Sequence, residues 1–326
     1  MIMAKVERID WIDWLKGIAI LWLMVYHFHA IDWLRSPVPV FFFLSGLFFS
    51  DKLPFGFFLT KKAKALLIPF LFFFTLWLIV SYAGMFVTGQ KFVFPEPWKL
   101  GTLIPSNADV TNPLGAGAIW FLISLFEIYV IYYVIRLVSQ KAWWIMLLNI
   151  VGYVIAILLL QRYANGSLFY LIYSFTFFAF FSIAHLYREK VIFDSMPKWL
   201  LIVAALGYSL TFIGGGGGGY YLLRAKGLVS TFGLIFLLIW ISKQVESSKL
   251  HDGSFLYRFL LFEGKNSLTI LGVHMLAQSF VGVILKRFMT VEFGYFIVLF
   301  LVELAICNLC VLLFNRYVPF LVNHHK

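Results

Sequence analysis

The sequence predicts an all-α polytopic membrane protein, a bundle of about ten transmembrane helices with both termini in the cytoplasm. Of the 326 residues, 62% are hydrophobic and only 13% are charged, and the mean hydropathy is +0.91. The apolar runs are about 20 residues long, which is the length of helix that crosses a hydrocarbon core. Because these runs are continuous and do not alternate with polar residues, they exclude a β-barrel.

The apolar runs predict ten spans in chain order, at residues 14–33, 37–51, 65–88, 116–137, 142–160, 167–186, 198–213, 220–242, 266–285 and 292–314. Three connections are longer than the rest: a basic segment expected at the membrane interface, a loop rich in Pro, Gly and Asn, and a polar connection, at 52–64, 89–115 and 243–265. No shift in composition marks a second domain, so residues 1–326 are expected to form one transmembrane domain without a soluble appendage. The run Gly214–Gly219 is expected to be a flexible outer turn, native or introduced.

The distribution of charge supports this number of spans. With both termini inside, 18 of the 26 lysines and arginines fall on the cytoplasmic side, as the positive-inside rule requires. The same bias accounts for the net charge of +11, and no basic run is interleaved with aromatic residues as a nucleic-acid surface would need. Cys307 and Cys310 lie in the last apolar run, where packing is a better interpretation than a metal or redox pair. We therefore expect no nucleic-acid partner and no metal.

The first span carries two ionisable residues that are costly to place at membrane depth, Lys16 near its start and His27 in its interior. They are eleven residues apart, close to three helical turns, so both point along one face about 16 Å apart. Asp13 is one turn from Lys16 and can pair with it. A cation at the water boundary and a titratable ring deeper in the bilayer favour a site for group transfer inside the membrane.

Other polar residues at membrane depth are candidates for the same site. His274 and Gln278 are four residues apart in the ninth span, share a helix face, and are expected to line one cavity with His27. A carboxylate close to His27 would raise its basicity. Glu127 in the fourth span is favoured for this role over Glu303 in the tenth, and a polar contact between helices is the other interpretation.

Two short segments have a structural and a functional interpretation. Asn266 and Ser267 open the ninth span, where their side chains would cap the helix or line the site. Ser45 and Gly46 are two small residues in an otherwise aromatic run, suited to close helix packing or to the passage of a thin cofactor arm.

Four motifs, in order, resemble those of the acyltransferase-3 family of integral membrane O-acyltransferases. They are Ile12–Ala19 with Tyr26–Phe28, then Phe41–Gly46, Trp120–Leu122, and Gly264–Leu268 continuing to His274. That family carries Arg or Lys, ten residues and then His in its first span, which Lys16 and His27 match. The chain departs from the family in the basic cluster before Pro69, where Lys61, Lys62 and Lys64 stand in a different register.

The resemblance implies transfer of an acyl group, usually acetyl from cytoplasmic acetyl-CoA, to a hydroxyl of a surface polysaccharide or lipid-linked sugar, in a bacterial plasma membrane. The expected partners are the lipid bilayer, acyl-CoA and a glycan acceptor. The CoA phosphates would dock at the cytoplasmic mouth, and the pantetheine arm would pass Ser45; the residues assigned to the mouth are Asp13, Lys16, Lys61, Lys62, Lys64 and Lys265. His27 would act as general base on the acceptor hydroxyl or, alternatively, carry the acyl group itself.

The acceptor is expected from the outer side. Trp120, at the outer start of the fourth span, would stack on a sugar ring, and Asn266, Ser267 and Gln278 complete the expected acceptor-binding residues. Asn266, Ser267 or His274 would hold the developing oxyanion.

Two other classes of protein remain. A transporter or flippase of a lipid-linked glycan or small solute would also bury histidines and carboxylates, but we find no internal repeat or paired broken helices. A purely structural subunit leaves the shared face of Lys16 and His27 without a purpose. The sequence leaves the acceptor, the acyl chain and the oligomeric state open.

Overall fold

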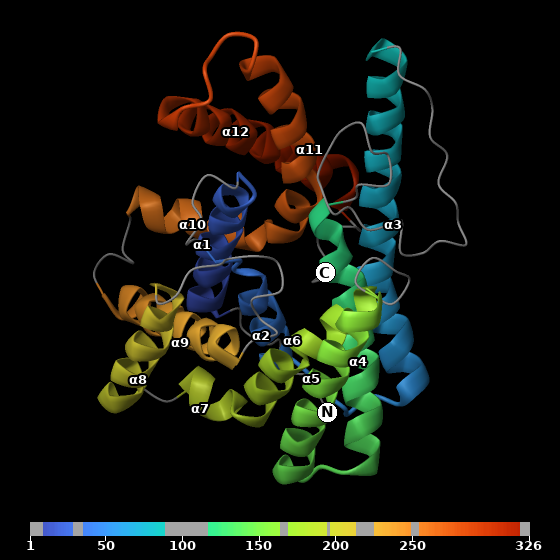
Figure 1. Ribbon diagram of the computed structural model, residues 1–326, viewed down its shortest axis with the longest axis vertical. Helices are drawn as coiled ribbons and strands as arrows, with labels where there is room; N and C mark the ends of the chain where they lie inside the picture. Colours follow the sequence, from blue (N-terminus) through green and yellow to red (C-terminus); the bar gives the residue numbers. More distant parts are fainter. Residues whose placement is uncertain are drawn as a thin grey trace.

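The computed structural model describes residues 9–28, 35–88, 117–163, 169–193, 196–212, 225–248 and 254–319, and these ranges contain helices and no strand (Figure 1). The α-helices are α1 Asp10–Tyr26, α2 Val38–Leu47, α3 Phe55–Thr88, α4 Trp120–Val138, α5 Ala142–Tyr163, α6 Phe169–Leu186, α7 Arg188–Phe193, α8 Lys198–Ser209, α9 Ala225–Ser247, α10 Phe255–Lys265, α11 Ser267–Leu285 and α12 Phe293–Tyr317. Two short 3-10 helices, η2 (Gly117–Ile119) and η3 (Leu210–Phe212), adjoin α4 and α8.

The chain is an all-α membrane protein. In the described residues, six helices are long and apolar enough to cross a bilayer, namely Phe55–Phe86, Trp120–Val138, Ala142–Leu159, Lys226–Ser247, Ser267–Leu285 and Phe293–Tyr317. Three shorter apolar helices are Val38–Leu47, Leu171–Leu186 and Lys198–Phe212. Each apolar run expected to span the membrane therefore contains a helix; in the first, α1 has 17 residues, starts at Asp10 and ends at Tyr26, just before His27. The loop at 89–115 and the run Gly214–Gly219 lie outside the described residues.

Two connections differ from expectation. The basic segment at 52–64 is not a separate element, because α3 begins at Phe55 and runs through Pro69 as one helix of 34 residues. The polar connection at 243–265 contains a helix of its own, α10. Its apolar residues are too few for a span, but Tyr257, Leu260 and Gly264 are buried on one face.

Helix α1 lies at the centre of the fold, in contact with α2, α9, α10 and α11. In Figure 1 it stands with α2 between the long α3 on one side and α8 and α9 on the other. Glycines allow the closest approaches: a side chain at Gly17 would collide with the carbonyl of Leu260, and one at Gly264 with the carbonyl of Asp13. The α1–α10 contact is thus made backbone to backbone, as small residues permit in membranes.

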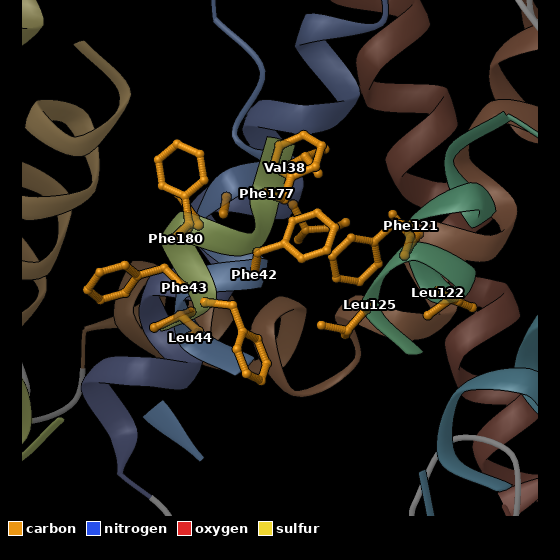
Figure 2. Close-up of a cluster of buried hydrophobic side chains, with 14 of the residues drawn as sticks. Val38, Phe42, Phe43, Leu44, Phe121, Leu122, Leu125, Phe177 and Phe180 are labelled. Atoms are coloured by element: carbon orange, nitrogen blue, oxygen red, sulfur yellow. The ribbon is translucent and has the colours of Figure 1, made fainter. Parts of the chain in front are cut away.

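Aromatic rings fill the space between α2, α4 and α6 (Figure 2). Phe42 of α2 stacks on Phe177 of α6, with ring centroids 4.4 Å apart, and meets Phe121 of α4 edge-on at 4.8 Å. Gly46, on the same helix as Phe42, lies against the backbone carbonyl of Phe181. The structural interpretation of Gly46 is confirmed, since it brings α2 against α6.

Candidate active site

Two histidines from distant parts of the sequence meet inside the bundle. His27 follows the last residue of α1, and its Nδ1 lies 2.9 Å from Nε2 of His274 in the middle of α11. The rings are stacked, with centroids 5.1 Å apart. Gln278 donates from Nε2 to the backbone carbonyl of His27 at 3.0 Å. The structure thus brings His27 together with His274 and Gln278, whose shared face their spacing indicated, although none of the three lines the cavity described below.

Hydrogen bonding fixes which nitrogens of the two rings carry protons. Nδ1 of His274 lies 3.0 Å from the carbonyl oxygens of both Ile270 and Leu271, which can only accept, so this nitrogen must be the N–H donor. In a neutral ring, Nε2 of His274 is then the acceptor, and Nδ1 of His27 must donate to it. Nε2 of His27 is left with a lone pair, which is the form that a general base requires. His274 has no N–H remaining for an oxyanion.

A cavity of about 230 Å³ lies on the Lys16 side of these histidines, between α1, α2, α3, α4 and α11. Its walls are mostly apolar, with Lys16 as the charged residue and two serine hydroxyls. The lining residues are Lys16, Phe41, Leu44, Ser45, Phe48, Ala65, Leu66, Phe121, Leu122, Leu125, Tyr129, Ser267, Leu268 and Leu271. Nζ of Lys16 lies 3.1 Å from Oδ1 of Asp13, which confirms the pairing within α1.

The other basic residues expected at the mouth of this cavity differ in their environment. Lys62 is half-buried, and its Nζ lies 3.6 Å from the centre of the Tyr129 ring, which lines the cavity. Lys61, Lys64 and Lys265 are exposed. Of the α3 cluster, Lys62 therefore has a described contact with the cavity wall.

The cavity ends one helical turn from His274. On α11 it includes Leu271, three residues before His274, and on α4 it includes Phe121. The backbone N–H of Ala118, just before α4, donates to Sδ of Met275 at 3.0 Å, so the start of α4 lies against α11 at the residue that follows His274. The cavity therefore runs from Lys16 toward the histidine pair.

Glu127 and Trp120, which were expected in the site, make their described contacts with α6. Oε2 of Glu127 accepts a hydrogen bond of 2.6 Å from Ser174 of α6, so its contact is made between α4 and α6. The Trp120 ring packs against Tyr173 at 4.7 Å, also on α6. A role for Glu127 in orienting His27 and a role for Trp120 with sugars stay predictions.

Asn266 joins helices without capping α11. It precedes α11 but makes no capping hydrogen bond with its side chain, so that expectation was wrong. Its Nδ2 donates instead to the carbonyl of Phe262 at 2.8 Å, and its Oδ1 accepts from Asn315 of α12 at 2.9 Å. With both amide atoms engaged, Asn266 ties the α10–α11 junction to α12.

Sequence reasoning missed Glu263, a carboxylate of α10 that is fully buried. Asn308 of α12 donates to its Oε1 at 2.9 Å. The signal was present, because Glu263 follows Leu260 by three residues on the face that packs against α1. In the described part of the chain, no three His, Cys, Asp or Glu side chains are grouped so as to hold a metal ion.

Comparison with known proteins places this arrangement in a family. A family model described as an acyltransferase domain, Acyl_transf_3, matches residues 9–312, nearly the whole chain. The chain therefore belongs to the acyltransferase-3 family and is a membrane-embedded acyltransferase. No curated protein and no solved structure matched the chain significantly.

Proposed function

We propose that this protein moves an acetyl group from cytoplasmic acetyl-CoA to a hydroxyl of a surface polysaccharide or lipid-linked sugar at the plasma membrane of a bacterium. The observation that carries the proposal is the hydrogen bond between His27 and His274 one turn beyond an apolar cavity that has Lys16 at its other end. Membership of an acyltransferase family supplies the reaction class.

The cavity has the chemistry that an acyl-CoA needs. Lys16 and Lys62 offer positive charge to phosphates at the cytoplasmic end. Apolar side chains line the path that a narrow pantetheine arm would take, and Ser45 and Ser267 provide hydroxyls for its amides. The rise of α1 from Lys16 to His27, about 16 Å, sets the length of arm that brings a thioester to the histidines.

His27 acts as the general base in this proposal. Its Nε2 removes the proton from the acceptor hydroxyl, and the oxygen attacks the thioester carbonyl as that proton leaves. The carbon–sulfur bond then breaks, and the proton passes from His27 to the departing sulfur, so that CoA leaves as its thiol. His274 does not touch the reactants; it holds His27 in the tautomer with a lone pair on Nε2.

The distance between cavity and histidines suits this chemistry. One helical turn is about 5.4 Å. A hydroxyl oxygen hydrogen-bonded to the base at about 3 Å and poised at about 3–3.5 Å from the carbonyl carbon would span a comparable distance. The acceptor would enter from the outer side, where Gln278 and Trp120 lie.

The test measures acyl-CoA binding and acyl transfer separately. Acetyl-CoA should raise the unfolding temperature of the purified protein, which a transporter or structural subunit would not show. Membranes that contain the protein should move label from radioactive acetyl-CoA into their glycan fraction. His27→Ala should lower that transfer by about 10²–10⁴-fold while leaving the thermal shift intact.

His185→Ala is the matched control, because His185 is hydrogen-bonded to Tyr132 at 2.8 Å and lies away from the cavity. This variant should keep transferring acetyl. Transfer at the normal rate by a stable His27→Ala protein would reject His27 as the base.

A further inference from the structure

The end of the cavity nearest the histidines is lined by two aromatic rings and a leucine, Phe41, Phe121 and Leu271, which we call the end wall. The rings of Phe41 and Phe121 meet edge to face, with centroids 6.0 Å apart. We propose that the end wall sets the length of the acyl group, admitting acetyl and rejecting longer chains. This inference rests on the proposed function, because it assumes that acyl-CoA fills the cavity.

The end wall lies where the acyl group must be. An arm that enters beside Lys16 carries its acyl group at the tip, and the deepest lining residue on α11 is Leu271, whose carbonyl accepts from His274. Phe121 is three residues from Ala118, which contacts Met275 beside His274. The thioester carbonyl therefore reaches the histidines only when the carbons beyond it lie against the end wall.

The end wall is held rigidly from behind. Phe121 contacts Phe42 at 4.8 Å, Phe42 stacks on Phe177 at 4.4 Å, and Phe177 stacks on Tyr173 at 5.8 Å. Figure 2 shows the rings of Phe121, Phe42 and Phe177 in this order across α4, α2 and α6. Because close-packed interiors do not yield to added methylene groups, Phe121 cannot retreat to admit a longer chain.

The expected discrimination is large. One methylene group in a tight apolar pocket changes the specificity of an enzyme by about 10–200-fold. Hexanoyl-CoA carries four methylene groups that acetyl-CoA lacks, so the wild-type protein should bind it at least about 100-fold more weakly than acetyl-CoA. Free CoA has no acyl group and should bind about as well as acetyl-CoA.

The experiment measures dissociation constants of CoA, acetyl-CoA and hexanoyl-CoA for the purified full chain. Phe121→Ala should bring hexanoyl-CoA to within about 10-fold of acetyl-CoA, and Phe121→Leu should open the cavity part of the way. Phe314→Ala is the matched control, since it removes a phenyl ring that packs on Phe72 of α3, away from the rings behind Phe121, and does not line the cavity. It should keep rejecting hexanoyl-CoA.

Each outcome decides one question. If wild-type protein binds neither CoA nor acetyl-CoA, the proposed function is wrong, and the end wall with it. If it binds acetyl-CoA and hexanoyl-CoA equally well, the end wall alone is wrong. The role of the end wall is also refuted if Phe121→Ala and Phe121→Leu both bind acetyl-CoA and still reject hexanoyl-CoA.

Discussion

At the scale of single residues, the proposed reaction gives His274 the role of positioning His27, and this role can be tested separately from its packing. His274→Leu fills similar space but removes the acceptor for the Nδ1–H of His27, so His27 loses the partner that fixes its tautomer. We expect acyl transfer to fall by about 10²–10⁴-fold, as it does when a catalytic histidine loses its orienting group. His274→Gln keeps an acceptor and should retain more activity.

The measurement is kcat and KM for acetyl-CoA in both variants. Because His274 does not line the cavity, KM should stay near its wild-type value while kcat falls. Equal losses in His274→Leu and His274→Gln would show that the ring acts through shape and not through its hydrogen bond.

Lys62 and Lys64 offer a second comparison between residues. They stand two positions apart on α3, but only Lys62 is described against Tyr129 of the cavity wall, and Lys64 is exposed. Loss of a charged hydrogen-bonding partner for phosphate costs about 1.5–3 kcal/mol, so Lys62→Ala should raise KM for acetyl-CoA by about 10-fold or more. Lys64→Ala should change it by less than about twofold. Steady-state kinetics of both variants measures these KM values. Equal increases in KM would show that the lysines of α3 act together as a basic surface and that Lys62 has no special role.

The sequence predicts the line from Lys16 to His27 and the shared face of His274 and Gln278, because helical periodicity alone sets which side chains lie together on one helix. The sequence says much less about which side chains on different helices contact each other. The sequence favours Glu127 as the partner of His27, yet the described bond of Glu127 is to Ser174. That contact depends on the rotation of α4 about its own axis, which packing against α6 sets. The spacing of residues along the sequence does not predict this rotation.

At the scale of elements, the backbone contact between α1 and α10 holds the start of the cavity, since α1 carries Lys16. Gly264→Ala would place a methyl group against the carbonyl of Asp13 and force the helices apart. We expect a loss of about 1–3 kcal/mol of stability, seen as a lower unfolding temperature. Gly84→Ala is the control, because a Cβ there meets no atom within 4 Å. It should be neutral or stabilising by about 0.5–1 kcal/mol.

The contact between α10 and α12 predicts a dependence on pH. Burial raises the pKa of the Glu263 carboxyl, and the hydrogen bond from Asn308 lowers it by a smaller effect. A raised pKa in the folded state means that the fold favours the protonated acid, so Glu263 destabilises the protein as pH rises above the ordinary carboxyl range. Glu263→Gln, which keeps an acceptor for Asn308, should therefore raise the unfolding temperature at neutral pH.

The advantage of Glu263→Gln should shrink as pH falls, because protonated Glu263 resembles the amide. Unfolding scans of both proteins between acid and neutral pH measure it. A constant difference across that range would show that the ionisation of Glu263 does not contribute to stability.

Apolar runs locate the elements well, because each long run must be helical to satisfy its backbone in lipid. They fail where a helix is amphipathic or continues past its apolar part. The apolar runs did not predict helix α10, because it lies in a polar connection and is amphipathic: one face packs on α1, while Phe255, Leu256 and Arg258 remain exposed. In the sequence, the start of α3 resembles a separate segment because its lysines interrupt the apolar run. The helix itself continues through them.

At the scale of the whole molecule, the proposed reaction requires an orientation: the mouth at Lys16 would have to face the cytosol, where acyl-CoA is present. Lysines and arginines then fall mainly inside, in agreement with the positive-inside rule. The six long apolar helices, the three shorter ones and α1 give an even number of crossings if each one spans the bilayer. An even number puts both termini on the same side.

We therefore predict that both termini are cytoplasmic. Green fluorescent protein, which fluoresces after folding in the cytosol but not after export in an unfolded state, should be bright when fused to either end. Alkaline phosphatase, which needs an oxidising compartment for its disulfides, should be inactive in the same positions. If the amino terminus alone were outside, one of the short helices α2, α6 or α8 would be a re-entrant segment. Outward placement of both ends would instead direct Lys16 away from the cytosolic thioester and contradict the proposed reaction.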